Sequence, residues 1–477
     1  MGRDGKGTGK IMTGIVFGVL TYWLFSQTLI NIVPEVQKDL GISLGILNTA
    51  ISLTGLFSGM FIVAAGGFSD RFGHKKVTYI GLILNIIGSL CLILANGIIL
   101  FVTGRIIQGF SAACIMPATI ALVKHNFDGP DRQRALSYWS FGSWGGGGIT
   151  SFFGGLVGTT LGWRWIFVFS IMITLLSMYL IKDVVESEFA ENKKAKFDVS
   201  GFIVFIIVMI ALNIVITRGG DFGWTSPISL TLIAVTVFGG WLFIKMANAK
   251  PNAFIDLSLF KNRYFTGATL SNFLLNAVAG TLIVANTYVQ VARGFSSFQS
   301  GLLSVGYLVA VLSMIRVGEK LLQKIGPRKP MVLAACLVAF GISLMLLTFL
   351  PNGIYSIIVF IGFTIYGVGL GIYATPSTDT AVDNVPAAKA GEASGIYKMA
   401  STLGGSFGLA ISVAVYGAFE KSGNFDAAAI AGLLANATFA ILALLAITLI
   451  IPKKKTVKTK MKKVSKPMKL KESKSHV

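Results

Sequence analysis

Long apolar stretches alternate with short polar ones along almost the whole chain. About 14 of these stretches run for roughly 20 residues with little charge, the length that an α-helix needs to cross a bilayer core. Helices satisfy their own backbone hydrogen bonds in lipid, and the period-2 alternation of a membrane β-barrel is absent. The pattern therefore predicts an all-α polytopic membrane protein. The expected helices cover residues 11–33, 45–66, 77–94, 99–123, 137–157, 165–181, 201–217, 227–244, 266–289, 301–317, 331–350, 354–377, 394–418 and 431–451.

Composition and charge agree with this interpretation. Hydrophobic residues make up 54% of the chain and charged residues only 13%, whereas about a quarter of an ordinary soluble domain is charged. Most of the 41 lysines and arginines fall in loops on the same side as the N-terminus, so the positive-inside rule places both termini in the cytoplasm. The net charge of +21 is then a consequence of topology, and nucleic-acid binding is not expected.

The sequence carries no signature of an enzyme, a cofactor or a metal site. The three cysteines lie within expected helices, and the three histidines lack the spacing of metal ligands. Neither H-E-x-x-H nor G-x-S-x-G occurs, and no P-loop is present that would bind ATP. We therefore expect neither catalysis nor a bound cofactor.

One loop, GGFSDRFGHKK at residues 66–76, concentrates charge between two apolar helices. A loop that only anchors topology needs basic residues but no acid, so Asp70 is unexpected there. Gly66 allows close approach of helices, and Gly73 permits a sharp turn. A carboxylate at this place can pair with an arginine or with the positive N-terminus of another helix. The loop is either a plain topology anchor or part of a conformational gate.

The same loop resembles the signature loop of the major facilitator superfamily. The matching positions are Gly66, Asp70, Arg71, Gly73 and Lys75. RIIQG at residues 105–109 resembles the fourth-helix motif of the drug:proton antiporters in that superfamily, and GWRWIF at 162–167 is similar to its fourteen-spanner branch. The longest runs of similar sequence in this chain resemble the Nor-type exporters of quinolones.

This resemblance implies the major facilitator fold, with two six-helix bundles and an extra two-helix hairpin. The N-terminal bundle would occupy residues 1–182, the linker and hairpin residues 183–261, the C-terminal bundle residues 262–452, and a basic cytoplasmic tail residues 453–477. It also implies a proton-driven antiporter of the bacterial plasma membrane that exports amphipathic drugs, such as quinolone-like antibiotics and dyes, by alternating access. We expect a monomer. The alternative is a proton-coupled exporter of an endogenous lipid or metabolite.

The residue that carries the proton is not identified by the motifs, because Ser26 stands where many fourteen-spanners carry an aspartate. The fourth-helix motif implies a role for Arg105 in proton coupling. Ionisable residues within membrane spans are costly, which makes each of them a functional candidate. Asp379 is the preferred proton carrier, and Glu319 and Glu392 are the alternatives.

The expected helix at 266–289 carries a polar stripe that either faces a water-filled cavity or makes interhelical hydrogen bonds. Lys398 either extends to the cytoplasm or points into the cavity, where it would favour a drug that bears a carboxylate. The candidate residues of the substrate cavity are Gln27, Asn31, Asn272, Asn276, Tyr397 and Lys398.

The gate hypothesis makes a structural prediction. Asp70 is expected to close the cytoplasmic side when the transporter faces outward. Its expected partners are Arg134, in the loop after the fourth helix, and the N-terminus of the helix that begins near Gly391 in the opposite bundle.

Overall fold

The computed structural model describes residues 5–26, 28–29, 32–42, 44–186, 198–250, 253–420 and 423–453. These residues form helices joined by turns and short irregular segments, and no strand occurs among them. The all-α fold expected from the hydrophobic pattern is therefore confirmed.

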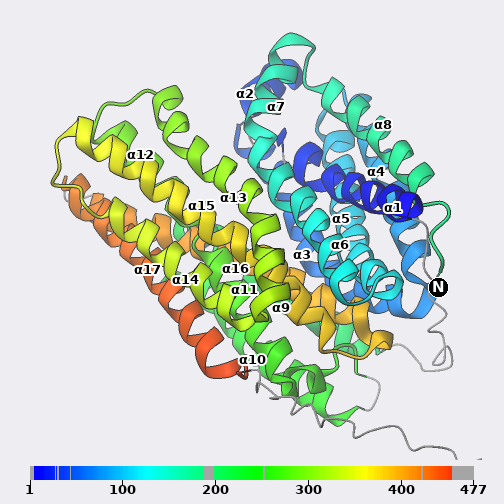
Figure 1. Cartoon of the computed structure of the whole chain (residues 1–477). Helices are drawn as coiled ribbons and strands as arrows, with labels where there is room; N and C mark the ends of the chain where they lie inside the picture. The colour runs from blue at the N-terminus through cyan, green and yellow to red at the C-terminus, as the bar shows by residue number, and fades with distance from the viewer. Residues whose placement is uncertain are drawn as a thin grey trace, which may run out of the picture.

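The first set of helices, here called the N-bundle, runs from α1 to α8. It lies at the right of Figure 1, in blue to cyan. Two π-helical turns, η1 and η3, interrupt its long helices. Its elements are α1 (Gly5–Leu20), η1 (Thr21–Ser26), α2 (Val33–Leu40), α3 (Leu44–Phe72), α4 (His74–Ile93), α5 (Ile98–Asn126), α6 (Gly129–Ser140), η3 (Phe141–Gly145), α7 (Gly146–Thr160) and α8 (Arg164–Leu180).

A hairpin of two helices follows, and then a second set of helices, here called the C-bundle. The hairpin consists of α9 (Val199–Phe222) and α10 (Pro227–Ala249). The C-bundle lies at the left of Figure 1, in light green to orange. Its elements are η5 (Leu257–Lys261), α11 (Arg263–Ala277), α12 (Gly280–Val291), α13 (Ser297–Ile325), α14 (Arg328–Met345), α15 (Asn352–Asp383), η6 (Ala387–Lys389), α16 (Ala390–Glu420) and α17 (Phe425–Ile450).

Twelve helices among the described residues are long and apolar enough to cross a membrane. A further apolar helix, Arg164–Leu180, has 17 residues and is shorter than these. The all-α arrangement agrees with the sequence, whereas the count of fourteen membrane spans stays a prediction.

The expected helix at 266–289 is interrupted in the structure. α11 ends at Ala277 and α12 begins at Gly280. α16 passes very close to this break, because a Cβ on Gly408 would lie 1.8 Å from the carbonyl oxygen of Ala277. Glycine at this position lets α16 contact the backbone of the interrupted helix directly.

The two bundles contact each other mainly at the end of the molecule where α1 begins. We call this the proximal end, and it includes the turn between α3 and α4 and the connector between α15 and α16. In the described residues, every hydrogen bond and ion pair that joins the N-bundle to the C-bundle lies there. The opposite, distal end carries no such link between described residues.

Candidate gate and transport site

Asp70 lies in the last turn of α3 and contacts the first turn of α16. The backbone N–H groups of Gly391 and Glu392 donate hydrogen bonds to its two carboxylate oxygens, at 2.7 and 2.8 Å. The helices approach closely here, because a Cβ on Gly66 would lie 2.2 Å from the carbonyl oxygen of Gly391. A carboxylate thus accepts two otherwise unsatisfied donors at the positive end of a helix in the other bundle. The expected contact of Asp70 with this helix N-terminus is present.

The expected contact of Asp70 with Arg134 is not among those of the described residues. Arg134 is exposed on α6, and the arginine that reaches the C-bundle is Arg132. Arg132 Nε donates to Asp379 Oδ1 at 3.0 Å, and its terminal nitrogen lies 2.7 Å from Asp383 Oδ1. The helical phase of α6 accounts for the difference, since residues 132 and 134 lie about 200° apart around a helix of 3.6 residues per turn.

Asp379 is buried at this interface on α15. Besides the contact with Arg132, its second carboxylate oxygen accepts a hydrogen bond from Gln133 Nε2 at 3.2 Å. Both donors belong to the N-bundle. The charge of Asp379 therefore helps to hold the two bundles together at the proximal end.

Lys124, at the end of α5, makes a third link that sequence reasoning missed. Its ammonium donates hydrogen bonds to the carbonyl oxygens of Val382, in the last turn of α15, and of Val385, in the connector that follows. A lysine in a basic loop region has no feature that distinguishes it from the topological excess of positive charge. Only the packing of the two bundles reveals its partner.

The rest of the charged loop binds within the N-bundle. Glu186 accepts hydrogen bonds from the backbone N–H groups of Lys75 and Lys76, each at 3.0 Å, at the start of α4. Its carboxylate fills the space beside Gly73, where a Cβ would lie 2.5 Å away, and Gly73 has a φ of +104°. Glycine is therefore required at position 73 for two reasons, because the positive φ disfavours a side chain and the carboxylate of Glu186 leaves no room for one. Arg71 is half-buried in the same turn.

Arg105 is fully buried in the N-bundle and binds no described acid. Its guanidinium donates to the carbonyl oxygens of Ser26 and Ile51, at 2.8 and 2.9 Å, and to Gln108 Oε1 at 2.9 Å. It thus joins η1 and α3 to α5. Gln27 and Asn31, which the sequence analysis named as candidate residues of the substrate cavity, lie outside the described residues.

Lys398 extends from α16 into the interface between the bundles. It is 7% exposed, and its ammonium lies 5.6 Å from the ring centre of Trp23 and 5.0 Å from that of Trp139. Both tryptophans belong to the N-bundle, so the contact is a cation–π interaction between the two bundles. No described carboxylate forms an ion pair with Lys398. The side chain faces the interface rather than the proximal surface.

One of the two amides of α11 binds to α16, and the other binds to its neighbour on α11. Asn272 is buried, and its Nδ2 donates to the carbonyl oxygen of Tyr397 at 2.9 Å and to Ser401 Oγ at 2.6 Å. Asn276 is half-buried and donates to Asn272. The Tyr397 hydroxyl donates to Ser377 Oγ at 2.9 Å on α15. These contacts fit the interhelical alternative for Asn272 and leave Asn276 partly accessible.

The two alternative acids both have partners close by. Glu319 is buried on α13, where its carboxylate pairs with Arg316 one turn earlier. Glu392, in the first turn of α16, accepts a hydrogen bond from the backbone N–H of Asp256. Asp256 also pairs with Lys389. Burial alone would raise the pKa of Asp256, but its hydrogen bonds, first of all that with Lys389, hold its pKa below the ordinary value.

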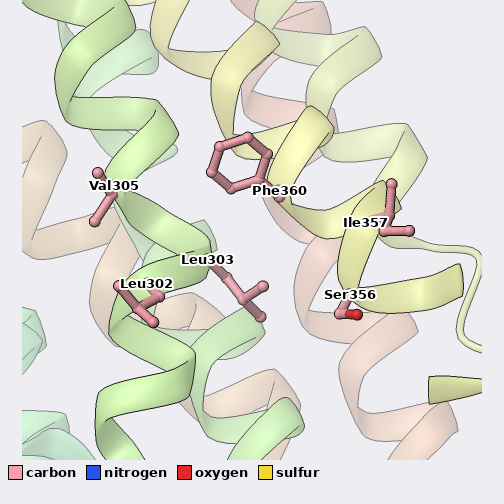
Figure 2. A pocket seen from close by; sticks show the side chains of 6 residues that line it. All are labelled: Leu302, Leu303, Val305, Ser356, Ile357 and Phe360. Atoms are coloured by element: carbon pink, nitrogen blue, oxygen red, sulfur yellow. The ribbon is translucent and has the colours of Figure 1, made fainter. Parts of the chain in front are cut away.

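A groove of about 480 Å³ lies elsewhere, between α13 and α15 (Figure 2). Most of its lining side chains are exposed and apolar, as expected for a surface that contacts lipid. None of the candidate site residues lines it, so the groove is separate from the candidate transport site. Its lining residues are Leu302, Leu303, Val305, Ser356, Ile357 and Phe360.

Comparisons of the sequence with known proteins match a family model and a relative over most of the chain. A family model described as Major Facilitator Superfamily matches residues 15–409. The quinolone resistance protein NorB of Staphylococcus aureus, in strains MRSA252 and COL, is 52% identical over 448 residues, which cover 94% of this chain and 97% of NorB.

Solved structures of low identity share the fold. The proton:xylose symporter XylE superposes with a TM-score of 0.67 at 16% identity, over 94% of this chain and 97% of that one. The human organic anion transporter MFSD10 gives 0.65 at 13% identity, over 93% and 100%. A bacterial homologue of the iron transporter ferroportin in the outward-facing state gives 0.65 at 12% identity, over 92% and 98%.

Proposed function

The chain belongs to the major facilitator superfamily, and on this basis we propose that it is a proton-driven antiporter that exports amphipathic drugs. The high identity to a quinolone resistance protein over nearly the whole chain supports quinolone-like antibiotics as substrates. The protein would act as a multi-pass monomer in the bacterial plasma membrane, with the proximal end and both termini in the cytoplasm, as the distribution of lysine and arginine favours.

One observation carries the mechanism. All hydrogen bonds and ion pairs between the bundles in the described residues lie at the proximal end. Contacts that close the proximal end fit the outward-facing state of an alternating-access cycle, in which the opposite end is open. Asp70, with Gly66 at the close approach, is then the latch that closes the cytoplasmic side.

Lys398 supports a site for drugs with an anionic group. A buried ammonium between two bundles is costly unless a counter-ion joins it, and no described acid does so. A carboxylate on the drug would supply the missing charge, while the indole rings of Trp23 and Trp139 offer flat surfaces to its aromatic part. Tyr397 precedes Lys398 on α16, Asn272 donates to the Tyr397 carbonyl oxygen, and Asn276 donates to Asn272, so these three candidates form one connected group in the C-bundle.

Asp379 is the preferred carrier of the coupled proton. Protonation would remove its charge and weaken its contacts with Arg132 and Gln133, both in the other bundle. The proximal end would then open towards the cytoplasm, where the proton leaves. Proton binding and bundle closure are thereby linked through the same side chain. Glu319 and Glu392 remain as alternatives, with Arg105 as a fixed buried charge.

The proposal is tested with purified protein in liposomes. An imposed pH gradient should drive a fluoroquinolone against its concentration gradient, and a protonophore should stop this transport. Protein-free liposomes are the control for passive leakage. Drug flux that is the same with and without the gradient would indicate a channel and contradict the antiporter. Failure to transport any drug, together with transport of extracted cell lipids or metabolites, would favour the alternative exporter.

A further inference from the structure

The connector between α15 and α16 is held by the N-bundle at both of its ends. α15 ends at Asp383 and α16 begins at Ala390, so only residues 384–389 separate the two helices. The C-terminus of one helix and the N-terminus of the next therefore lie close together. They present opposite partial charges to the N-bundle, negative at the end of α15 and positive at the start of α16.

Each of these helix ends meets a side chain of the opposite charge. At the start of α16, the carboxylate of Asp70 accepts two backbone N–H groups. At the other end of the connector, the ammonium of Lys124 donates to the carbonyl oxygens of Val382, in the last turn of α15, and of Val385, two residues beyond that helix. The last carbonyls of a helix lack partners within it, so a lysine from another bundle satisfies one such acceptor of α15 and one carbonyl of the connector.

The two contacts also lie within electrostatic reach of each other. The charge of Lys124 acts on Asp70, and it acts as well on Asp379, Asp383 and Arg132. Half-burial of Lys124 strengthens such interactions relative to those of a solvated surface charge. The five side chains form one cluster around the connector.

We propose that Lys124 is a second positioning residue of the cytoplasmic gate, which fixes the end of α15 as Asp70 fixes the start of α16. The role of Lys124 in a gate rests on the proposed transport function, whereas its effect on the distance between the bundles does not. Because six residues join the two helices, they cannot separate from the N-bundle independently. Release of one helix end therefore loosens the other, and the two contacts act together.

A matched control exists within the chain. Lys75 also donates its ammonium to a backbone carbonyl at the proximal end, that of Lys182, but both residues belong to the N-bundle. A lysine that only stabilises the fold should behave like Lys75. A lysine that positions the gate should instead change the distance between the bundles.

The test measures that distance without drug or pH gradient. Spin labels are placed at Phe72 and Ile325, the exposed last residues of α3 and α13, after replacement of the three native cysteines. Lys124→Met should increase the population with a long proximal distance by roughly 5-fold or more. Lys124→Arg keeps the charge and should restore the native distribution, and Lys75→Met should leave it unchanged.

Three outcomes would overturn the proposal. The first is a native distribution in Lys124→Met, the second is an equal shift in Lys75→Met, and the third is independent effects of Lys124→Met and Asp70→Asn. If Lys124→Met does not accumulate in the membrane, Lys124→Gln, which keeps a donor, should show the same shift to a smaller extent.

In a double-mutant cycle, Lys124→Met and Asp70→Asn should shift the distribution by less than the product of their separate effects. Independent effects would contradict the joint action of the two contacts. Since wild-type transport is not needed, failure of drug export would leave this test intact.

Discussion

Replacement of Asp70 by asparagine should open the proximal end of the protein. Asparagine has the same size but only one acceptor oxygen, so one of the two N–H groups of α16 would face an amide NH2 group instead of a carboxylate oxygen. Loss of the charge also removes the favourable interaction with the helix end. Together these changes should cost the closed state about 2 kcal/mol, which corresponds to a population change of roughly 30-fold.

The assay is the distance between spin labels at Phe72 and Ile325, measured in lipid nanodiscs on the cysteine-free background. The wild-type distribution should be dominated by the short proximal distance of the closed gate. Asp70→Asn should move it towards longer distances, and drug export should fall without a loss of protein from the membrane. Arg132→Ala should act in the same direction, because it also removes a link between the bundles.

Asp183→Asn is the matched control. Asp183 is an acid at the same end of the molecule, but it pairs with Lys10 inside the N-bundle at 2.9 Å. Asp183→Asn should leave the distribution of spin-label distances unchanged. If Asp70→Asn gives the wild-type distribution as well, the contact with α16 does not hold the gate, and the charged loop serves topology alone.

Three further predictions concern the transport site and the packing of the C-bundle. Asp379→Asn should abolish drug-induced proton release in detergent while drug binding stays measurable by fluorescence, and retained release would assign the proton to another acid. Lys398→Ala should weaken export of carboxylate drugs more than export of permanent cations in a cell accumulation assay, and an equal loss of both would remove this lysine from the drug site. Gly408→Ala should destabilise the protein by about 1–3 kcal/mol in thermal unfolding, because the new methyl group meets the Ala277 carbonyl at 1.8 Å. Gly405→Ala, with open space around it, should be tolerated.

Those parts of the gate that depend on local chemistry could be predicted from the sequence. An acid in a basic loop and a helix start near Gly391 are both visible without a structure, and their contact follows from the family fold. The choice between Arg132 and Arg134 could not be predicted. It depends on the rotation of α6 about its axis, which the loop sequence does not fix. A two-residue difference turns a side chain from the interface to the solvent.

Contacts between bundles were the hardest to predict, because they join residues far apart in the chain. Lys398 is a candidate from its place in an apolar helix, but nothing near it in the sequence indicates that Trp23 and Trp139 surround its ammonium. The polar stripe of α11 gives the opposite lesson. Its polar positions recur at helical spacing, but the same pattern serves either a cavity or a neighbouring helix, and in the structure Asn272 contacts α16.

The mode of binding of Arg105 has a consequence for how the protein can evolve. Two of its three acceptors are main-chain carbonyls, those of Ser26 and Ile51, which every amino acid provides. Substitutions at positions 26 and 51 can therefore accumulate without removing these acceptors, provided that the helices keep their register. An insertion or deletion in α3 or η1 would instead rotate the carbonyls away. Selection at this place acts on helix register rather than on side-chain identity, so homologues can preserve the contact while their residues diverge.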